Sequence, residues 1–401
     1  MKDFLKKNIF LIIGGIGLYL LSTGIAYATF SYLQPGEMVS PAPLITEEGG
    51  FKVDVSAPKT EACPLNGEKY TKSEKEAWEK LRPLIVMIEN HDDARPQSGL
   101  SNADVVYEAV AEGGITRFLA IFYCDIISAA RSGVYDLGPV RSARTYYLDW
   151  ASEYSDYPLY VHVGGAHCSE AYEGGPCTTP REARALEQIG DYGWLSQRND
   201  MNQFSLGYNV CRREPERTGR TLATEHTMYC GSFTLWEEAL KRGLGAVDED
   251  GNQWNKNFVS WQFKEEKAGG QSLSPEFYFW EGYKEYQVKW EYDSGSNHYK
   301  RINGGTAHLD NNNQEQLTTK NVVIQFVQER STGDPNKHLL YTTAGEGRAL
   351  IFQDGQLIKG EWSKKNRKSR TIFTDLNGKE IKFNPGPIWI EVLPIGSEVD
   401  Y

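Results

Sequence analysis

The chain has 401 residues, of which 40% are apolar, 24% charged and 12% aromatic, and its formal net charge is −11 at pH 7. This composition excludes a wholly disordered or low-complexity chain, because enough apolar surface is present to form a core. The acidic balance argues against a nucleic-acid partner, since that affinity comes from Lys and Arg side chains that neutralise phosphates. The length is sufficient for two domains.

The N-terminus carries the pattern of a membrane segment. Three lysines precede an uncharged run over residues 9–30, and at about 1.5 Å per residue such a run spans roughly the 30 Å hydrocarbon core. Lysines before the run and none within it place the N-terminus in the cytoplasm and the bulk of the chain outside. An Ala-x-Ala pattern at 26–28 is typical of a cleaved signal peptide. We expect a retained single-pass anchor over 1–30, with cleavage as the alternative.

Three segments follow this anchor, and each has its own composition. Residues 31–69 contain five prolines and few periodic apolar residues, which predicts a tether. Residues 70–245 alternate helix-like and strand-like patterns, which predicts a mixed α+β or α/β N-terminal domain. Residues 255–401 carry alternating aromatic and β-branched runs separated by turn signals, which predicts a smaller β-rich C-terminal domain.

The N-terminal domain carries the clearest local signals. We expect helices at 73–81, 142–154, 181–189 and 232–242, strands at 83–89 and 158–163, and two strands on either side of Gly113 and Gly114.

The strand at 83–89 is apolar and leads into polar residues. Glu89 closes it, and Asn90 and Arg95 follow. Polar groups at the carboxyl end of a buried strand are where α/β sheets place ligands. Glu89 is therefore a candidate catalytic group, and Asn90 and Arg95 are candidate ligand contacts.

Gly113 and Gly114 predict a two-residue hairpin turn. In the register of such a turn Val110 faces Arg117, and Arg117 shares one face of the sheet with Glu108 and Glu112. Two interpretations of these charges stay open. They form either a solvated ladder of ion pairs, worth about 0 to 1 kcal/mol per pair, or a site that holds an anion.

The segment 138–144, Gly-Pro-Val-Arg-Ser-Ala-Arg, stands before an aromatic helix. Ser142 is a good N-cap, but Arg141 and Arg144 oppose the positive end of the helix dipole. A negative group should compensate, either a carboxylate of the chain or a bound phosphate or carboxylate. Arg117, Arg141, Ser142 and Arg144 are therefore candidate ligand residues, together with Glu108.

Two histidines complete the candidates. His162 lies on the strand at 158–163, and His226 lies in the sequence Thr-Glu-His-Thr. Each is either a hydrogen-bonded core residue or, with Glu89 or Glu112 nearby, a general acid or base. No Walker loop, H-E-x-x-H or C-x-x-C motif is present, so the sequence predicts no metal and no cofactor.

The six cysteines are an even number in a chain that we expect to be exported, which indicates disulfides. Cys168 and Cys177 bracket a short loop of turn residues and form the first expected pair. The pairs Cys211 with Cys230 and Cys63 with Cys124 then follow by elimination among the 15 connectivities that six cysteines allow.

Several of these segments resemble one bacterial family. They are Arg-Pro-Leu-Ile-Val-Met-Ile-Glu-Asn-His at 82–91, Glu-Gly-Gly-Ile-Thr-Arg-Phe at 112–118, Gly-Pro-Val-Arg-Ser-Ala-Arg at 138–144, and Asn-Pro-Gly-Pro-Ile-Trp-Ile at 384–390. The chain is similar to the YerB-like "putative lipoproteins", extracytoplasmic proteins of undefined activity. The resemblance implies a mixed N-terminal domain, a smaller C-terminal domain and a place outside the cytoplasm. The chain departs from the lipoprotein pattern because it lacks a lipid-accepting cysteine, which leaves the helix as the anchor.

Two functions follow from these observations. The first is a cell-envelope protein, held in the cell membrane by its N-terminal helix, that binds an anionic small molecule or cell-wall polymer. The second is an envelope enzyme, because the order of the Arg-bearing strand, Arg-x-x-Arg and helix resembles in outline the LytR-CpsA-Psr phosphotransferases. That enzyme would act on a lipid-linked phosphate or a cell-wall glycan. Its arginines would clamp the phosphate, and Glu89, Glu108 or Glu112 would hold Mg²⁺ or act as the base. We expect the binding function, with the enzyme as the alternative.

Overall fold

The computed structural model of the chain describes residues 22, 50–132, 135–170 and 175–401. Apart from residue 22, the predicted anchor over 1–30 lies outside the described residues. Among the residues that are described, no helix is long and apolar enough to cross a membrane. The chain divides into two compact units, residues 1–44 and 45–401, and the second holds the fold described below.

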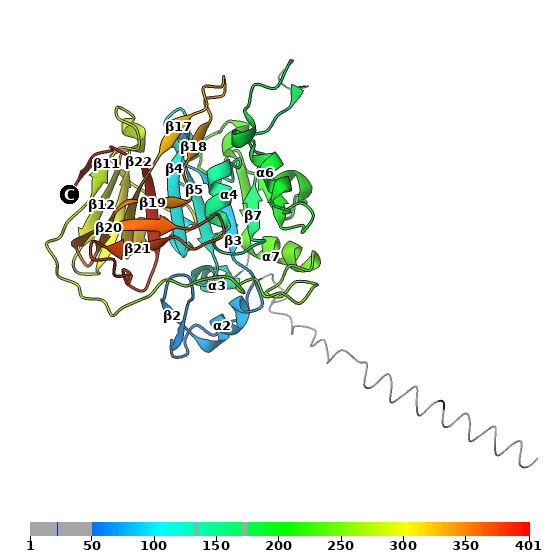
Figure 1. Cartoon of the computed structure of the whole chain (residues 1–401). Coiled ribbons are helices and arrows are strands. Elements are labelled where there is room, and N and C mark those ends of the chain that lie inside the picture. Colours follow the sequence, from blue (N-terminus) through cyan, green and yellow to red (C-terminus); the bar gives the residue numbers. More distant parts are fainter. Residues whose placement is uncertain (1–21, 23–49, 133–134, 171–174) are drawn as a thin grey trace, which may run out of the picture. The chain divides into compact units, whose positions relative to one another are not determined.

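A mixed sheet of ten strands forms the centre of this unit (Figure 1). In spatial order its strands are β21 (Ile372–Asp375), β20 (Gln356–Lys364), β19 (Gly345–Gln353), β16 (Asn321–Val327), β22 (Ile388–Pro394), β4 (Val105–Glu112), β5 (Ile115–Phe122), β3 (Leu84–Glu89), β7 (Leu159–His162) and β8 (Asp200–Asn202). The central strands β3, β4, β16 and β22 are almost wholly buried, which explains their continuous apolar sequences.

The two halves of the chain share this sheet. Residues 70–245 supply β3, β4, β5, β7 and β8, and residues 255–401 supply the other five strands. The halves meet where β22 runs parallel to β4, with Ile388 opposite Val105 and Glu391 opposite Glu108. The protein thus has two mostly β halves with few helices. The sequence predicted the order of the halves but not the sheet that joins them.

A second sheet of six strands belongs to the C-terminal half. It contains β14 (Thr306–Ala307), β13 (His298–Asn303), β12 (Val288–Asp293), β11 (Glu276–Phe277), β23 (Val399–Asp400) and, beside β13, β15 (Thr318–Thr319). It packs on one face of the central sheet through Trp290 of β12, whose ring meets Trp389 of β22 edge to face with 5.1 Å between the ring centroids. We call this side of the central sheet face A.

The opposite side of the central sheet, face B, is covered by α4 (Thr145–Ala151). Its Trp150 stacks on Tyr107 of β4, and Tyr147 donates its hydroxyl to the carbonyls of Ala109 and Arg117. The hairpin of β17 (Glu329–Ser331) and β18 (Leu339–Tyr341) contacts the same helix, with the Tyr341 ring against Tyr146. A segment of the C-terminal half therefore reaches over the N-terminal half.

The remaining elements surround the N-terminal half. They are the pair β1 (Glu61–Ala62) and β2 (Lys69–Tyr70), the three-stranded sheet of β6 (Asp136–Leu137), β10 (Met228–Gly231) and β9 (Cys211–Arg213), and the helices α2 (Lys72–Trp78), α3 (Asp125–Ala129), α6 (Ala185–Asp191) and α7 (Ser232–Lys241). α2 begins earlier than predicted, because Thr71 and Glu74 form a capping box.

The β4–β5 hairpin differs from its predicted register. The turn is at Gly113 and Gly114 and Glu112 faces Ile115, but the pairing shifts between Val110 and Glu112. Beyond this β-bulge Arg117 faces Ala109, not Val110. A one-residue shift moves side chains to the other face of a sheet, so the prediction that Glu108 shares a face with Arg117 and Glu112 is wrong.

Part of the predicted tether is folded. Phe51 is buried against Phe233 and Trp236 of α7. Cys63 is bonded to Cys124, which directly precedes α3. The stretch over 50–69 therefore belongs to the compact unit, although its prolines resemble those of a linker. Residues 31–49 lie outside the described residues.

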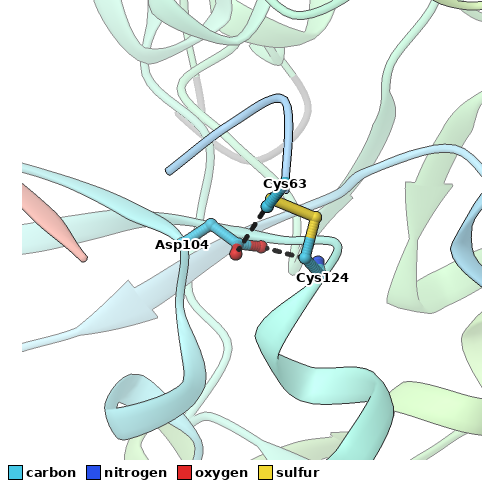
Figure 2. Close-up of side chains that lie close together, drawn as sticks. All are labelled: Cys63, Asp104 and Cys124. Atoms are coloured by element: carbon cyan, nitrogen blue, oxygen red, sulfur yellow. Dashed lines mark hydrogen bonds between the residues drawn. A yellow bond between two sulfur atoms is a disulfide. The ribbon is translucent and has the colours of Figure 1, made fainter. Parts of the chain in front are cut away.

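The three disulfides join the pairs expected from the sequence, Cys63–Cys124, Cys168–Cys177 and Cys211–Cys230. Figure 2 shows the first of these beside Asp104, whose carboxylate accepts the backbone N–H of Cys124 at 2.9 Å. Asp104 also accepts the Tyr123 N–H and the Asn66 amide. Burial raises the pKa of the Asp104 carboxyl to about 8, and the nearby Asp125 adds to the rise.

Candidate functional site

The central sheet opens between β3 and β7. These strands pair in parallel over Leu84–Val86, and beyond that point the segment 138–144 lies between them. The Arg141 N–H donates to the Met87 carbonyl of β3, and the Arg141 carbonyl accepts the Val163 N–H that follows β7. This insertion places the Arg-Ser-Ala-Arg motif at the end of the sheet, on the side of Glu112.

Glu112 lies between two arginines. It forms an ion pair with Nε of Arg144 through Oε1 and, at 3.2 Å, with Arg117 through Oε2. Arg117 also donates to the Ser142 carbonyl at 3.0 Å, and Arg144 donates to the Ser142 hydroxyl at 3.1 Å. The bulge in β4 is what turns Glu112 toward Arg117 on face B.

Arg141 forms the second part of the cluster. Its Nε lies 3.0 Å from Glu89 Oε1. The two side chains form an ion pair, but the N–H is not aligned for a hydrogen bond. The other Glu89 oxygen contacts His226 Nδ1 at 2.8 Å, and this hydrogen bond raises the pKa of the His226 imidazole. Glu89 is buried, whereas 28% of the Arg141 side chain is exposed. Within the described residues, the two terminal nitrogens of Arg141 form no hydrogen bond.

These groups surround a pocket of about 500 Å³. Its lining includes Glu112, Arg141, Ser142, Arg144, Gly165, His167, Thr179, Asn336 and His338. The last two come from the turn between β17 and β18, so both halves of the chain form the pocket. Arg117 lies beneath it and is almost fully buried.

The pocket has a surplus of positive charge. Three arginines (Arg117, Arg141 and Arg144) face two glutamates (Glu89 and Glu112). Burial raises the pKa of the Glu112 carboxyl, but the guanidinium groups of Arg144 and Arg117 outweigh that effect and lower the pKa to about 2. Burial and the neighbouring Arg144 lower the pKa of Arg117. Repulsion among the arginines is thus only partly relieved by the two carboxylates.

Glu108 lies elsewhere, on face A. Its side chain is fully buried and forms an ion pair with Arg301 of β13, which also pairs with Glu391 of β22 at 2.8 Å. Glu108 further accepts hydrogen bonds from Thr116 at 2.6 Å and from Asn90 at 3.0 Å. Glu108 is therefore part of the packing between the two halves and does not line the pocket.

Asn90 and Arg95 belong to the same side as Glu108. Asn90 is buried, and its side-chain amide oxygen accepts hydrogen bonds from Arg95 and Gln97, each at 3.0 Å. The Arg95 guanidinium lies 5.2 Å from the ring centroid of Tyr286. Neither residue lines the Arg141 pocket, so the predicted ligand residues divide between two places.

Two further predictions need correction or a structural interpretation. α4 begins at Thr145 with Arg144 as its N-cap residue, so Ser142 is not the N-cap and the predicted helix over 142–154 is shorter at both ends. His162 is fully buried, with Nε2 at 2.6 Å from Asp200 and Nδ1 at 2.7 Å from the Gly164 carbonyl. Both His162 nitrogens are engaged, which is typical of a core histidine.

Two groups in the described part of the chain bring potential metal ligands together. Cys63, Asp104 and Cys124 form one, but both sulfurs belong to a disulfide and cannot supply a thiolate. His91, Asp93 and His226 form the other, with one ligand atom from each within 4.8 Å of the others. The second group lies beside Glu89.

Sequence reasoning missed several residues of this region. His338 and Asn336 line the pocket although they are nearly 200 residues from Arg141, and no local pattern relates the two segments. His91 and Asp93 belong to the polar stretch after the strand at 83–89, where ligands are expected. The sequence gives no sign that these two residues lie beside His226.

Comparison with known proteins places the chain in a family. Residues 67–179 match a model described as "Protein of unknown function (DUF3048) N-terminal domain", and residues 278–390 match the model for the corresponding C-terminal domain. A Bacillus subtilis protein named "Putative lipoprotein YerB" is 27% identical over 333 residues, which cover 83% of this chain and 86% of that protein. The chain belongs to the YerB-like family.

A solved structure has a fold similar to that of this chain. The crystal structure of YerB from Bacillus subtilis superposes with a TM-score of 0.65 at 24% identity, and the match covers 85% of this chain and all of that one. The likeness at this identity concerns the fold. The N-terminal model covers the pocket arginines and β4, and the C-terminal model ends at residue 390, within β22.

Proposed function

We propose that this YerB-like protein is held in the cell membrane, lies mostly outside the cytoplasm and binds a phosphate- or carboxylate-bearing anion in the pocket lined by Arg141, Ser142 and Arg144. The observation that carries the proposal is the surplus of guanidinium over carboxylate groups around one open pocket. The name of the Bacillus subtilis relative, a lipoprotein, supports the envelope location. The apolar run over 9–30 is the proposed anchor.

The arginines are suited to this role by their positions. Arg141 is partly exposed and meets Glu89 through its Nε, and its terminal nitrogens form no hydrogen bond within the described residues, so they can donate to a ligand. Arg144 and the Ser142 hydroxyl lie at the same pocket wall. Arg117 adds charge from beneath. Guanidinium groups bind carboxylate and phosphate in a bidentate way, and such hydrogen bonds to charged groups contribute about 1.5 to 3 kcal/mol each.

Binding of simple probes tests the proposal. The full-length chain is titrated with inorganic phosphate, pyrophosphate and citrate by isothermal calorimetry. We expect saturable binding of at least one probe, weakened about tenfold or more in Arg141→Gln and Arg144→Gln. Arg181→Gln is the matched control, because Arg181 has an 82% exposed side chain that pairs with the exposed Asp191. No binding, or equal binding by all variants, would overturn the proposal.

The location is tested separately. A tag fused after Tyr401 should be removed by protease added to intact cells after cell-wall digestion, and the chain should fractionate with membranes. A protected tag would contradict the proposed orientation, whatever the binding result.

The phosphotransferase hypothesis stays a prediction. Its three candidate carboxylates, Glu89, Glu108 and Glu112, each contact an arginine, so none is a free base. The titrations above, repeated with Mg²⁺ and followed by phosphate assay, report any turnover of pyrophosphate.

A further inference from the structure

A second cluster lies behind Arg141, at the carboxyl end of β3. His91 follows that strand, Asp93 belongs to the short helical turn η1 (Asp92–Ala94), and His226 ends a similar turn, η6 (Thr224–His226). The rings of His91 and His226 stack with 4.7 Å between their centroids. One ligand atom from each of the three side chains lies within 4.8 Å of the others.

His226 is oriented as metal-binding histidines are. Its Nδ1 lies 2.8 Å from Glu89 Oε2, and the residue is only 7% exposed. A carboxylate that receives the Nδ1 proton fixes the tautomer and leaves Nε2 as a lone-pair donor, the arrangement common in zinc sites. Within the described residues, Nε2 of this buried ring has no hydrogen-bond partner.

His91 completes the pair from the rim of the cluster. Its Nδ1 lies 3.2 Å from the backbone nitrogen of Asp93 and 2.9 Å from Asp92 Oδ1. It accepts the Asp93 N–H in one tautomer and donates to Asp92 in the other. The second tautomer leaves Nε2 as the lone-pair donor, as Glu89 does for His226. Asp93 is exposed, and within the described residues its carboxylate forms two long ion pairs, with Arg220 and with His91 Nδ1, each at 3.8 Å, so it can move toward an ion.

The charge around the cluster favours a cation. Four carboxylates (Glu89, Asp92, Asp93 and Glu225) lie close to the two rings, and two guanidinium groups (Arg141 and Arg220) oppose them. Two imidazoles and one carboxylate suit zinc and similar transition metals, whereas Mg²⁺ and Ca²⁺ prefer all-oxygen sites.

We infer that His91, Asp93 and His226 form a site for a divalent transition metal ion of the zinc class, with Glu89 orienting His226. Three protein ligands leave a fourth position open to water or to another ligand. The site is separate from the Arg144 pocket but adjoins it, because Glu89 contacts both His226 and Arg141.

Zinc titration of the full-length chain, first stripped with a chelator, tests the inference. We expect one Zn²⁺ per chain by calorimetry, and a tetrahedral visible absorption band when Co²⁺ replaces Zn²⁺. His91→Asn and Asp93→Asn, both at partly exposed positions, should each weaken Zn²⁺ binding more than tenfold. Glu89→Gln should weaken it about tenfold, the lower end of the effect of removing a supporting carboxylate.

Two controls make the result specific. His298→Asn replaces a histidine of the C-terminal half that lies outside the cluster, and Arg144→Gln alters the anion pocket without touching the three ligands. Both should keep the wild-type affinity for Zn²⁺. The inference is overturned if the wild-type chain binds no Zn²⁺ stoichiometrically, or if His91→Asn and Asp93→Asn bind as His298→Asn does.

Discussion

Two clusters of arginine and glutamate lie on opposite faces of the central sheet, and β4 contributes one glutamate to each. On face A, Glu108 and Glu391 share Arg301, and all three side chains are fully buried. On face B, Glu112 and Glu89 face Arg117, Arg141 and Arg144 around a pocket. The residue types are the same. The ratio of charges and the exposure of Arg141 separate a structural cluster from a candidate binding site.

The buried cluster holds the two halves of the chain together. Glu108 and Glu391 are direct neighbours across the parallel pair β4–β22, and two carboxylates at that position would repel each other without a shared cation. Arg301 supplies the cation from β13, with its guanidinium 4.6 Å from the ring centroid of Trp389. Its Nε donates to His308, so each part of the guanidinium is used.

Arg301→Met should have the largest effect on stability. It leaves Glu108 and Glu391 buried without a partner, and breaking a buried ion pair from one side costs about 3 to 5 kcal/mol. Urea unfolding measures the loss. Arg330→Met is the control, because Arg330 and Glu182 form an exposed pair worth about 0 to 1 kcal/mol. A loss for Arg301→Met no larger than the control would contradict the role assigned to the face A cluster.

Glu112→Gln should lower stability in a way that depends on pH. The ordinary glutamate pKa of 4.5 falls to about 2 in the folded chain, so the ionised carboxylate stabilises the fold above pH 4.5, and the contribution is lost as the pH falls to about 2. The gap in unfolding free energy between wild type and variant is then roughly 3 kcal/mol at neutral pH. It should close in acid. A gap independent of pH between neutrality and about pH 2 would refute this.

Glu391→Gln should show the opposite pH dependence. Burial raises the pKa of Glu391 above 4.5, although Arg301 opposes the shift. The contribution of Glu391 to the unfolding free energy is therefore fully present at low pH and is lost as the pH rises through the folded-state pKa. Relative to wild type, the variant should gain stability as the pH rises from about 5 to about 8. If the unfolding free energies of the variant and the wild type change in parallel with pH, Glu391 does not have the pH dependence opposite to that of Glu112.

Arg141→Gln should have the smallest effect on stability. Its side chain is partly exposed, and Glu89 retains His226 as a neighbour, so the expected loss is below about 1 kcal/mol. The same variant should nevertheless lose anion binding. Thermal melting measures the first quantity and calorimetry the second. A large loss of stability would make Arg141 a structural residue like Arg301.

Local sequence patterns predicted many of the helices, strands and turns, because each of these elements depends on residues that are close together in the chain. The strand at 83–89, the turn at Gly113 and Gly114 and the helix at 232–242 all lie within a residue or two of their expected places. The disulfide pairs were also correct. The parallel pairing of β22 with β4 had no local signal, since its partners are far apart in the chain.

The candidate site was predicted in part, and one backbone irregularity explains the error. Glu112, Arg141, Ser142 and Arg144 do line one pocket. A regular hairpin would place Glu108 on the same face as Glu112, but the β-bulge between Val110 and Glu112 moves Glu112 to the other face. A run such as Ala-Val-Ala-Glu gives no local signal for a β-bulge. Arg301, the true partner of Glu108, is 193 residues away in sequence.

The position of β22 has a consequence for the synthesis of this protein. This strand, Ile388–Pro394, lies between β4 and β16 in the central sheet, although it follows both of them in the chain. During synthesis, the edges of β4 and β16 that pair with β22 therefore stay unpaired until β22 has emerged. Such edges are templates for aggregation, so we expect the nascent N-terminal half to need protection, and we expect truncation before β22 to be far more damaging than truncation after it.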